Sequence, residues 1–155
     1  MVRRRWYIKI AFCITILLSQ LNLASQQQDS TPVGGELRVN LIGIKNNRGV
    51  VLLSLFGSPE GYPSDPTKAL IKLRIPLKQL QLPIIIKSLK PGSYAIALLH
   101  DEDENGKMLT SIIGLPKEGY GFSNNVMGLA GPPSFQKASF PVSSTVSTIT
   151  LRVRY

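Results

Sequence analysis

Hydrophobic and polar residues alternate in short runs from residue 36 to the end of the chain. In residues 36–41, leucine and valine occupy every second position and charged or amide residues occupy the others. A period of two is typical of a strand that buries one face. No stretch repeats apolar residues at helical spacing over three turns. The pattern therefore predicts about seven short strands, over residues 36–44, 50–56, 69–75, 84–86, 94–100, 135–141 and 147–155.

Two of these runs, 50–56 and 94–100, are apolar on both faces, which is typical of strands at the centre of a sheet. Turn-forming residues 46–49 separate the first two strands, so we expect these strands to pair as a hairpin. The strand pattern predicts an all-β fold, a single antiparallel β-sandwich. A small barrel of the lipocalin-like or nucleic-acid-binding kind is less favoured, because a long insert, residues 101–134, leaves and re-enters one end of the sheet.

The first 24 residues have the composition of a secretory signal peptide. Basic residues lie within 3–9, and an uncharged apolar run follows over 10–18. A spanning helix needs about 20 apolar residues, roughly twice the length of this run. We therefore predict cleavage after Ala24 and an exported protein, in the periplasm or the external medium, with no membrane span once the signal is removed. An uncleaved N-terminal anchor is the alternative, because Asn22 is not the small residue preferred at its place before the cut.

The predicted mature chain consists of a short lead-in and one domain. Residues 25–35 contain three glutamines and a Gly-Gly pair but little apolar surface, so we expect a flexible segment there. Residues 36–155 are the length of one domain and can form a core without a metal or a disulfide.

Charge and cysteine content exclude several classes of function. The chain carries 18 basic and nine acidic residues; removal of 1–24 takes away four basic residues and leaves 14 against nine, a net charge of +5. These charges are scattered and not interleaved with aromatic residues, so we expect no nucleic-acid partner. Cys13 is the only cysteine and His100 the only histidine, which excludes an internal disulfide and gives a Cys-His nucleophile pair little support.

The long insert opens with a pattern of oxygen-bearing side chains. Asp101, Asp103 and Asn105 stand at alternate positions and Gly106 follows. These residues match the beginning of a calcium loop, in which the carbonyl of the seventh residue, here Lys107, is a further ligand. The sequence thus offers Asp101, Asp103, Asn105 and Lys107 as candidate ligands for calcium.

The remainder of the calcium motif is absent. Leu109 and Ile112 stand at the ninth and twelfth positions, where a calcium loop has a water-linked ligand and a bidentate glutamate. The alternative is an acidic turn whose Asp and Asn side chains accept hydrogen bonds from their own backbone. Glu118 can supply a missing carboxylate only if the loop folds back.

His100 and Asp101 are adjacent, so on a strand they point to opposite faces and cannot pair with each other. His100 shares the face of Tyr94, Ile96 and Leu98, which favours a buried, hydrogen-bonded structural histidine. The alternative is a hydrolase that uses His100 with Asp101 or Asp103, although no nucleophile is indicated by its local sequence.

A second candidate surface lies later in the insert, where aromatic and amide residues are interleaved. Rings and amides together can stack on a sugar or contact a peptide. We therefore predict an extracytoplasmic ligand, carbohydrate or protein, and assign its binding to these residues together with His100. Alternatively, the segment is a lid that packs on the end of the sheet. The candidate residues are His100, Tyr120, Phe122, Ser123, Asn124 and Asn125.

The chain contains a set of unusual stretches: Gly-Ser-Tyr-Ala-Ile-Ala (92–97), His-Asp-Glu (100–102), Asn-Gly-Lys (105–107), 114–125 and Gly-Pro-Pro-Ser-Phe (131–135). Together these stretches resemble the bacterial family known as domain of unknown function 2141. The resemblance extends over 36–155 and implies a signal peptide and one small β domain, with no established activity. Leu109 and Ser111 replace an aspartate and an asparagine of the family's acidic loop, which weakens any inherited cation site.

The Pro-Gly-x-Tyr strand start, residues 91–94, is also similar to transthyretin-like and collagen-adhesin modules, so an immunoglobulin- or transthyretin-like sandwich is implied by analogy of fold alone. From these observations we expect a non-enzymatic binding or envelope-associated module that acts through residues 101–134. The alternatives are a weak calcium-binding structural module and, less favoured, the hydrolase that uses His100.

Overall fold

The structure is a computed structural model that describes residues 34–129 and 131–155. The predicted signal peptide and nearly all of the predicted lead-in lie outside the described residues. The strands are β1 (Gly35–Ile42), β2 (Val50–Phe56), β3 (Ile71–Pro76), β4 (Ile84–Leu89), β5 (Gly92–Asp101), β6 (Gly119–Phe122), β7 (Phe140–Val142) and β8 (Val146–Arg152). The helices are short: 3-10 turns η1 (Pro66–Lys68), η2 (Leu77–Gln79) and η3 (Ser123–Asn125), and the α-helix α2 (Phe135–Ala138).

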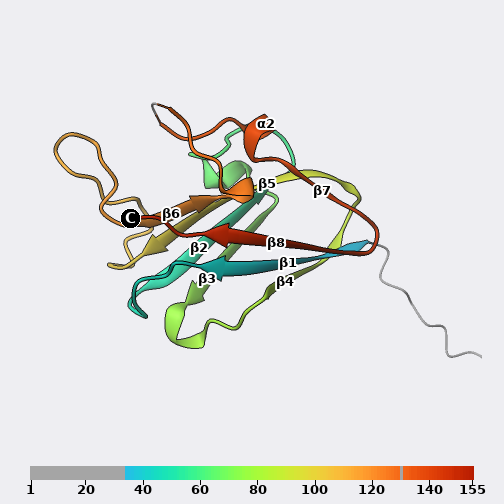
Figure 1. The fold of residues 1–155 in the computed structure, drawn as a ribbon, viewed down its shortest axis with the longest axis horizontal. Coiled ribbons are helices and arrows are strands. Elements are labelled where there is room, and N and C mark those ends of the chain that lie inside the picture. The colour runs from blue at the N-terminus through green and yellow to red at the C-terminus, as the bar shows by residue number, and fades with distance from the viewer. Residues whose placement is uncertain (1–33, 130) are drawn as a thin grey trace, which may run out of the picture. The chain divides into compact units, whose positions relative to one another are not determined.

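The strands form two sheets, so the prediction is confirmed as far as a mostly β fold. One sheet has the order β4-β1-β8, and the other has the order β3-β2-β5-β6, with β7 pairing to β5 as well (Figure 1). The pairings are antiparallel except that of β1 with β8, which is parallel. The expected hairpin of the first two strands is wrong, because β1 and β2 belong to different sheets.

Residues that follow β8 connect the two sheets along one edge. The Val153 amide donates to the Ile42 carbonyl at 2.8 Å, which continues the pairing with β1. The next residue, Arg154, exchanges two backbone hydrogen bonds of 2.8 Å with Tyr120 of β6. The last residues of the chain therefore hydrogen-bond to strands of both sheets.

One hydrophobic core lies between the sheets, and the alternating pattern of the sequence produces it. Leu37, Val39 and Leu41 of β1 are buried there, as are residues of β2, β4, β5 and β8. The second face of β2 is also buried at Val50 and Phe56, as its two-sided apolar sequence predicts. All the core residues lie within 37–153, so the predicted mature chain retains the whole core.

Two parts of the expected element pattern are wrong. The insert 101–134 contains β6, whose two glycines gave little indication of a strand. A side chain at Gly119 would come within 2.6 Å of the Tyr155 ring, and one at Gly121 within 2.5 Å of Leu151, so close approach to the chain's C-terminal segment requires both glycines. The strand expected over 135–141 begins instead as α2, which Ser134 caps, and becomes β7 only at Phe140.

Candidate cation site beside a buried histidine

Pairing of β6 with β5 brings the end of the insert back to its beginning. His100 lies opposite Gly119 in the antiparallel register. Glu118, which immediately precedes β6, therefore lies beside Asp101 and Glu102. The folding back that a cation site requires does occur.

Three carboxylates gather at this point. Asp101, Asp103 and Glu118 each have an oxygen that lies within 4.8 Å of an oxygen of the other two. Asp101 is fully buried, Glu118 is 3% exposed and Asp103 is exposed. Two of the three negative charges are thus almost completely withdrawn from water.

Backbone amides supply most of the hydrogen bonds to the cluster. The Asn105 and Gly106 amides donate to the two oxygens of Asp101, at 3.1 and 2.8 Å. The Glu102 and Leu109 amides donate to the two oxygens of Glu118, at 2.9 and 2.8 Å. Glu118 therefore fastens both sides of the loop, and Asp101 caps the turn as the acidic-turn interpretation predicted.

The Asn105 side chain forms hydrogen bonds within the same turn. Its amide group donates to Asp103 at 2.7 Å, and its side-chain oxygen accepts the Lys107 amide at 2.7 Å. The structure thus brings together two of the four predicted ligands, Asp101 and Asp103, and adds Glu118. Asn105 and Lys107 lie in the same turn and stay predictions as ligands.

The cluster carries uncompensated negative charge. Within residues 34–129 and 131–155, no lysine or arginine forms an ion pair with any of its three carboxylates. Burial raises the pKa of Asp101, and the adjacent Asp103 and Glu118 contribute to the same direction. A cation bound beside Asp101 would oppose this shift, because a nearby positive charge favours the carboxylate.

The spacing and the chemistry of the three groups suit a hard cation. Calcium binds oxygen at 2.3–2.6 Å, so ligand oxygens on opposite sides of one ion are about 4.8 Å apart. Each carboxylate oxygen keeps a second lone pair after it accepts one backbone hydrogen bond. Three oxygens at these distances can therefore share one ion, with water or a carbonyl to complete the coordination.

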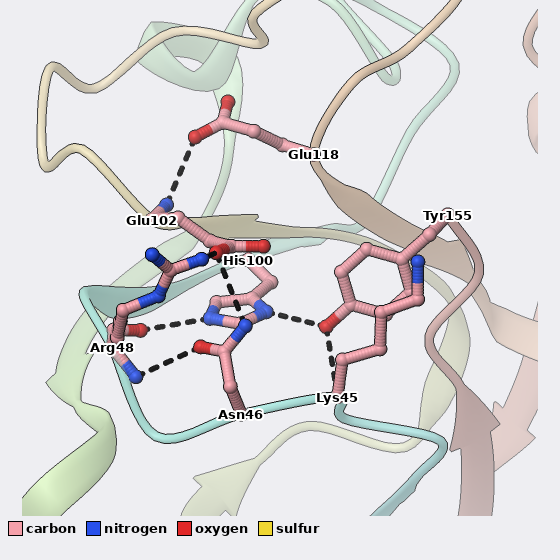
Figure 2. Close-up of polar contacts among 7 residues, drawn as sticks. All are labelled: Lys45, Asn46, Arg48, His100, Glu102, Glu118 and Tyr155. Atoms are coloured by element: carbon pink, nitrogen blue, oxygen red, sulfur yellow. Dashed lines mark hydrogen bonds and ion pairs between the residues drawn. The ribbon is translucent and has the colours of Figure 1, made fainter.

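His100 is fully buried and lies on the face of β5 opposite to Asp101, its neighbour in the strand. Figure 2 shows its hydrogen-bond partners. Its Nε2 lies 2.8 Å from the Arg48 carbonyl, and its Nδ1 lies 2.5 Å from the Tyr155 hydroxyl. A carbonyl can only accept, so Nε2 carries the proton and Nδ1 accepts from Tyr155 in the neutral ring. The Tyr155 oxygen in turn accepts the Lys45 amide at 3.1 Å.

This arrangement defines the role of the histidine. Both ring nitrogens are bonded within the protein, so neither has a free site for a substrate, as the structural interpretation predicted. Burial also raises the pKa of Tyr155, which favours the protonated hydroxyl that donates to His100. We name the contacts among Lys45, Arg48, His100 and Tyr155 the histidine latch.

Glu102 connects the latch to the loop, a role that its position in the sequence does not indicate. Its carboxylate accepts from the Asn46 amide group at 3.1 Å and forms an ion pair with Arg48 (Figure 2). These two partners lower the pKa of Glu102. Its backbone amide donates to Glu118, so the turn before β2 and the cation cluster contact one residue.

The polar residues of the predicted aromatic-amide surface form hydrogen bonds with other parts of the protein. Ser123 is buried, accepts the Ile96 amide at 2.8 Å and donates to the Ala138 carbonyl at 2.6 Å. Asn124 donates to the Ser139 carbonyl at 2.8 Å. Asn125 donates to the Thr150 carbonyl at 3.1 Å and accepts the Arg152 amide at 2.7 Å. These contacts fasten the insert to the helix α2 region and to β8.

The aromatic residues of that surface are half-buried and close to other rings. The Tyr120 and Phe122 ring centroids are 6.0 Å apart, and those of Tyr62 and Phe122 are 6.4 Å apart. The ring centroids of Tyr62 and Phe135 are 5.8 Å apart. Ligand binding by Tyr120 and Phe122 stays a prediction.

The fold and the site define a mostly β domain of two sheets, with a carboxylate cluster at the base of a long loop. Residues 39–150 match a family described as an uncharacterized protein conserved in bacteria (DUF2141), and the chain belongs to this family. No curated protein and no solved structure matches the chain. Among the described residues, no helix has the length and apolar character needed to cross a bilayer.

Proposed function

We propose that this protein is an exported, non-enzymatic β-sandwich module in which a calcium ion holds the 101–118 loop. The observation that carries this proposal is the meeting of Asp101, Asp103 and Glu118, two of them buried and none paired with a basic side chain in the described part of the chain. Buried charges are strongly unfavourable unless they are paired or coordinate a metal.

Calcium fits the cluster better than magnesium does. Magnesium requires near-ideal octahedral geometry at 2.0–2.1 Å, whereas calcium accepts irregular sets of six to eight oxygens. Exposed Asp103 lies at the solvent side of the cluster and leaves room for water ligands. A soft metal is disfavoured, because all three groups are hard oxygen donors and the predicted mature chain has no cysteine.

The loop contacts give the ion a structural task. Asp101 and Glu118 together bind amides of residues 102, 105, 106 and 109. Neutralising their charge would stabilise this whole segment at once. We therefore assign the ion the task of fixing the 101–118 loop.

The test is calorimetric titration of calcium into the predicted mature chain, residues 25–155, after treatment with a chelator. We expect one site per chain that is lost in Asp103→Asn and in Glu118→Gln. Glu104→Gln is the matched control, because Glu104 is an acidic residue of the same loop that pairs with Arg74 outside the cluster. Absence of heat and of any thermal shift with calcium would disprove the proposal.

A second function, ligand binding on the outer face of the five-stranded sheet, is favoured by the half-buried rings of Tyr62, Tyr120 and Phe122. Such rings can stack on the apolar face of a sugar. Tyr120→Ala should abolish binding to a carbohydrate array if this surface is used, and Tyr94→Phe, which alters a ring in the core instead, should not.

A further inference from the structure

The segment between the cation cluster and β6 is a small hairpin with an apolar tip. Thr110 pairs with Pro116, the Lys117 amide donates to the Leu109 carbonyl at 2.8 Å, and the Ser111 amide donates to the Leu115 carbonyl at 2.8 Å. In Figure 1 this gold segment projects from the body of the sheets near the C-terminus. We name residues 107–117 the projecting hairpin.

The residues at its corner are unusual for a turn. The Gly114 amide donates to the Ser111 carbonyl at 2.9 Å, so Ile112 and Ile113 are the two central residues of a β-turn. Such positions are typically Gly, Asn, Asp, Pro or Ser, whereas β-branched aliphatic residues gain nothing there. Ile112 is fully exposed and Ile113 is 79% exposed.

The apolar character is not limited to the corner. Leu115 is 59% exposed and Leu109 is 45% exposed. Backbone hydrogen bonds define the shape of the hairpin, yet its aliphatic side chains contact little of the protein. A patch of this kind indicates an interaction surface.

The charged residues of the projecting hairpin are both lysines. From Gly106 to Lys117 there is no acidic residue, and exposed Lys107 and Lys117 stand at the two ends of the hairpin. Glu118, the next residue, is buried, and Glu104 is neutralised by its contact with Arg74 at 2.6 Å. Exposed Asp103 belongs to the carboxylate cluster at the base of the hairpin and not to its tip. An apolar tip above a pair of lysines is complementary to the anionic headgroups and acyl chains of a bilayer.

The shape of the surface favours a membrane over a protein. A stable protein interface covers about 800 Å² on each partner with matched shapes, whereas the exposed tip is a convex turn of a few aliphatic side chains. A bilayer requires no matching contour, and aliphatic side chains can enter it wherever they project far enough.

We propose that the projecting hairpin docks the protein on an anionic lipid bilayer, with Ile112, Ile113 and Leu115 in the acyl boundary and Lys107 and Lys117 against the headgroup phosphates. This inference goes beyond the proposed function and does not rest on it. The Leu109 amide donates to Glu118, but the hydrogen bonds that form the arms and the corner of the hairpin join its own residues.

The experiment is co-sedimentation of residues 25–155 with vesicles of phosphatidylglycerol and phosphatidylcholine, in chelator and in millimolar calcium. The predicted mature chain is used because the apolar run 10–18 would itself bind lipid. We expect binding to the mixed vesicles, at least tenfold weaker binding to pure phosphatidylcholine, and loss at high salt. Ile112→Ser with Ile113→Ser should reduce the affinity at least tenfold, and Lys107→Ser with Lys117→Ser several-fold.

The control variant is Ile85→Ser, which removes an aliphatic side chain that is 49% exposed on β4 and should bind as the unaltered chain does. Ile113→Trp gives a direct reading of insertion, because the only natural tryptophan, Trp6, is absent from residues 25–155. Its emission should move to the blue on vesicles and be quenched by brominated acyl chains.

Three results would overturn the inference: no sedimentation with the anionic vesicles, equal binding of the double isoleucine variant, or no change in the emission of the introduced tryptophan. Self-association that the isoleucine variant abolishes, without vesicle binding, would assign the tip to contact between copies instead. Vesicle binding in chelator with no calcium titration would support the hairpin and contradict the cation site, so the two proposals can fail separately.

Discussion

His100 and Asp101 are neighbours in the chain and both are fully buried, yet their surroundings differ in kind. His100 contacts one donor and one acceptor, which match the two nitrogens of a neutral ring. Asp101 accepts two backbone hydrogen bonds but lies beside two further carboxylates without a basic partner in the described residues. The histidine latch pairs both ring nitrogens within the protein, whereas the carboxylate cluster has no basic partner among the described residues.

The difference separates a structural polar group from a candidate binding site. Every buried side-chain polar atom in the described part of the chain has a hydrogen-bond partner, so a count of hydrogen bonds does not distinguish the two residues. The distinction comes from charge, because hydrogen bonds from amides only partly offset three neighbouring carboxylates. Removing a latch residue should therefore damage the fold, while removing a cluster residue should chiefly change the response to ions.

The largest expected effect is that of His100→Ala. The change leaves a cavity and removes the partners of the Tyr155 hydroxyl and the Arg48 carbonyl, so we expect a loss of about 3–4 kcal/mol in the free energy of unfolding. Denaturant unfolding of residues 25–155 measures it. His100→Asn keeps a smaller donor and acceptor, so it should lose less stability than His100→Ala. Equal stability of the unaltered chain and both variants would contradict the structural role of the latch.

Calcium should have the next largest effect on the stability of the folded protein, and this effect should depend on the carboxylate cluster alone. An ion at 100 times its dissociation constant stabilises the folded state by about 2.7 kcal/mol. We expect a rise of several degrees in the unfolding midpoint when calcium replaces chelator, and no rise in Asp101→Asn. His100→Asn tests the comparison, because its midpoint should be lower but should still rise with calcium.

Tyr155→Phe should have a smaller effect than either. It removes the hydroxyl that donates to His100 and accepts from Lys45 but keeps the ring, so we expect a loss of about 1–2 kcal/mol in the free energy of unfolding. The unaltered chain should also lose stability as the pH rises above about 10, since the raised pKa of Tyr155 keeps the phenol protonated longer in the folded state. That alkaline loss should be smaller in Tyr155→Phe, and identical profiles would contradict the assignment.

The change with pH in the contribution of Asp101 to the free energy of unfolding should be smaller still. Its pKa is raised on folding, so its contribution to stability is present below the unfolded value of about 3.9 and is lost as the pH rises through the folded value. In chelator, the midpoint difference between the unaltered chain and Asp101→Asn should therefore change in favour of the unaltered chain as the pH is lowered from 7 toward 4. In calcium the trend should reverse, because an ion favours the carboxylate; the same trend in both media would contradict the cluster.

The smallest expected effect is that of Glu104→Gln. Glu104 and Arg74 form a half-exposed ion pair, which is worth no more than about 0.5 kcal/mol. Its unfolding curve should nearly coincide with that of the unaltered chain, with and without calcium. A loss of the calcium response in this variant would place the ion outside the three-carboxylate cluster.

The sequence predicted the elements more completely than their partners. The apolar runs at β2 and β5 are in place, and the alternating pattern of residues 147–155 buries Leu151 and Val153 as expected. Strand β6 was missed because glycine lowers strand propensity, although the close approach of Tyr155 is what requires Gly119. Helix α2 has four residues, too few for a helical period to be recognised.

The candidate site likewise has one part that the sequence predicts and another part that depends on how distant strands pair. Asp101, Asp103 and the turn at Gly106 could be recognised from spacing, because their contacts are local. Glu118 is separated from Asp101 by 17 positions and reaches it only because β6 pairs with β5. The Tyr155 partner of His100 is 55 residues away and depends on the path of the chain after β8.

By itself, the sequence determined the two-residue period of the strands, the acidic turn and the burial of its single histidine, since each follows from neighbouring residues and from the cost of exposing apolar surface. The tertiary structure alone decided which strands share a sheet, which glutamate joins the aspartates and which tyrosine bonds the histidine. Those choices depend on how strands distant in sequence pair around one core, and the local pattern of a strand does not specify its partner.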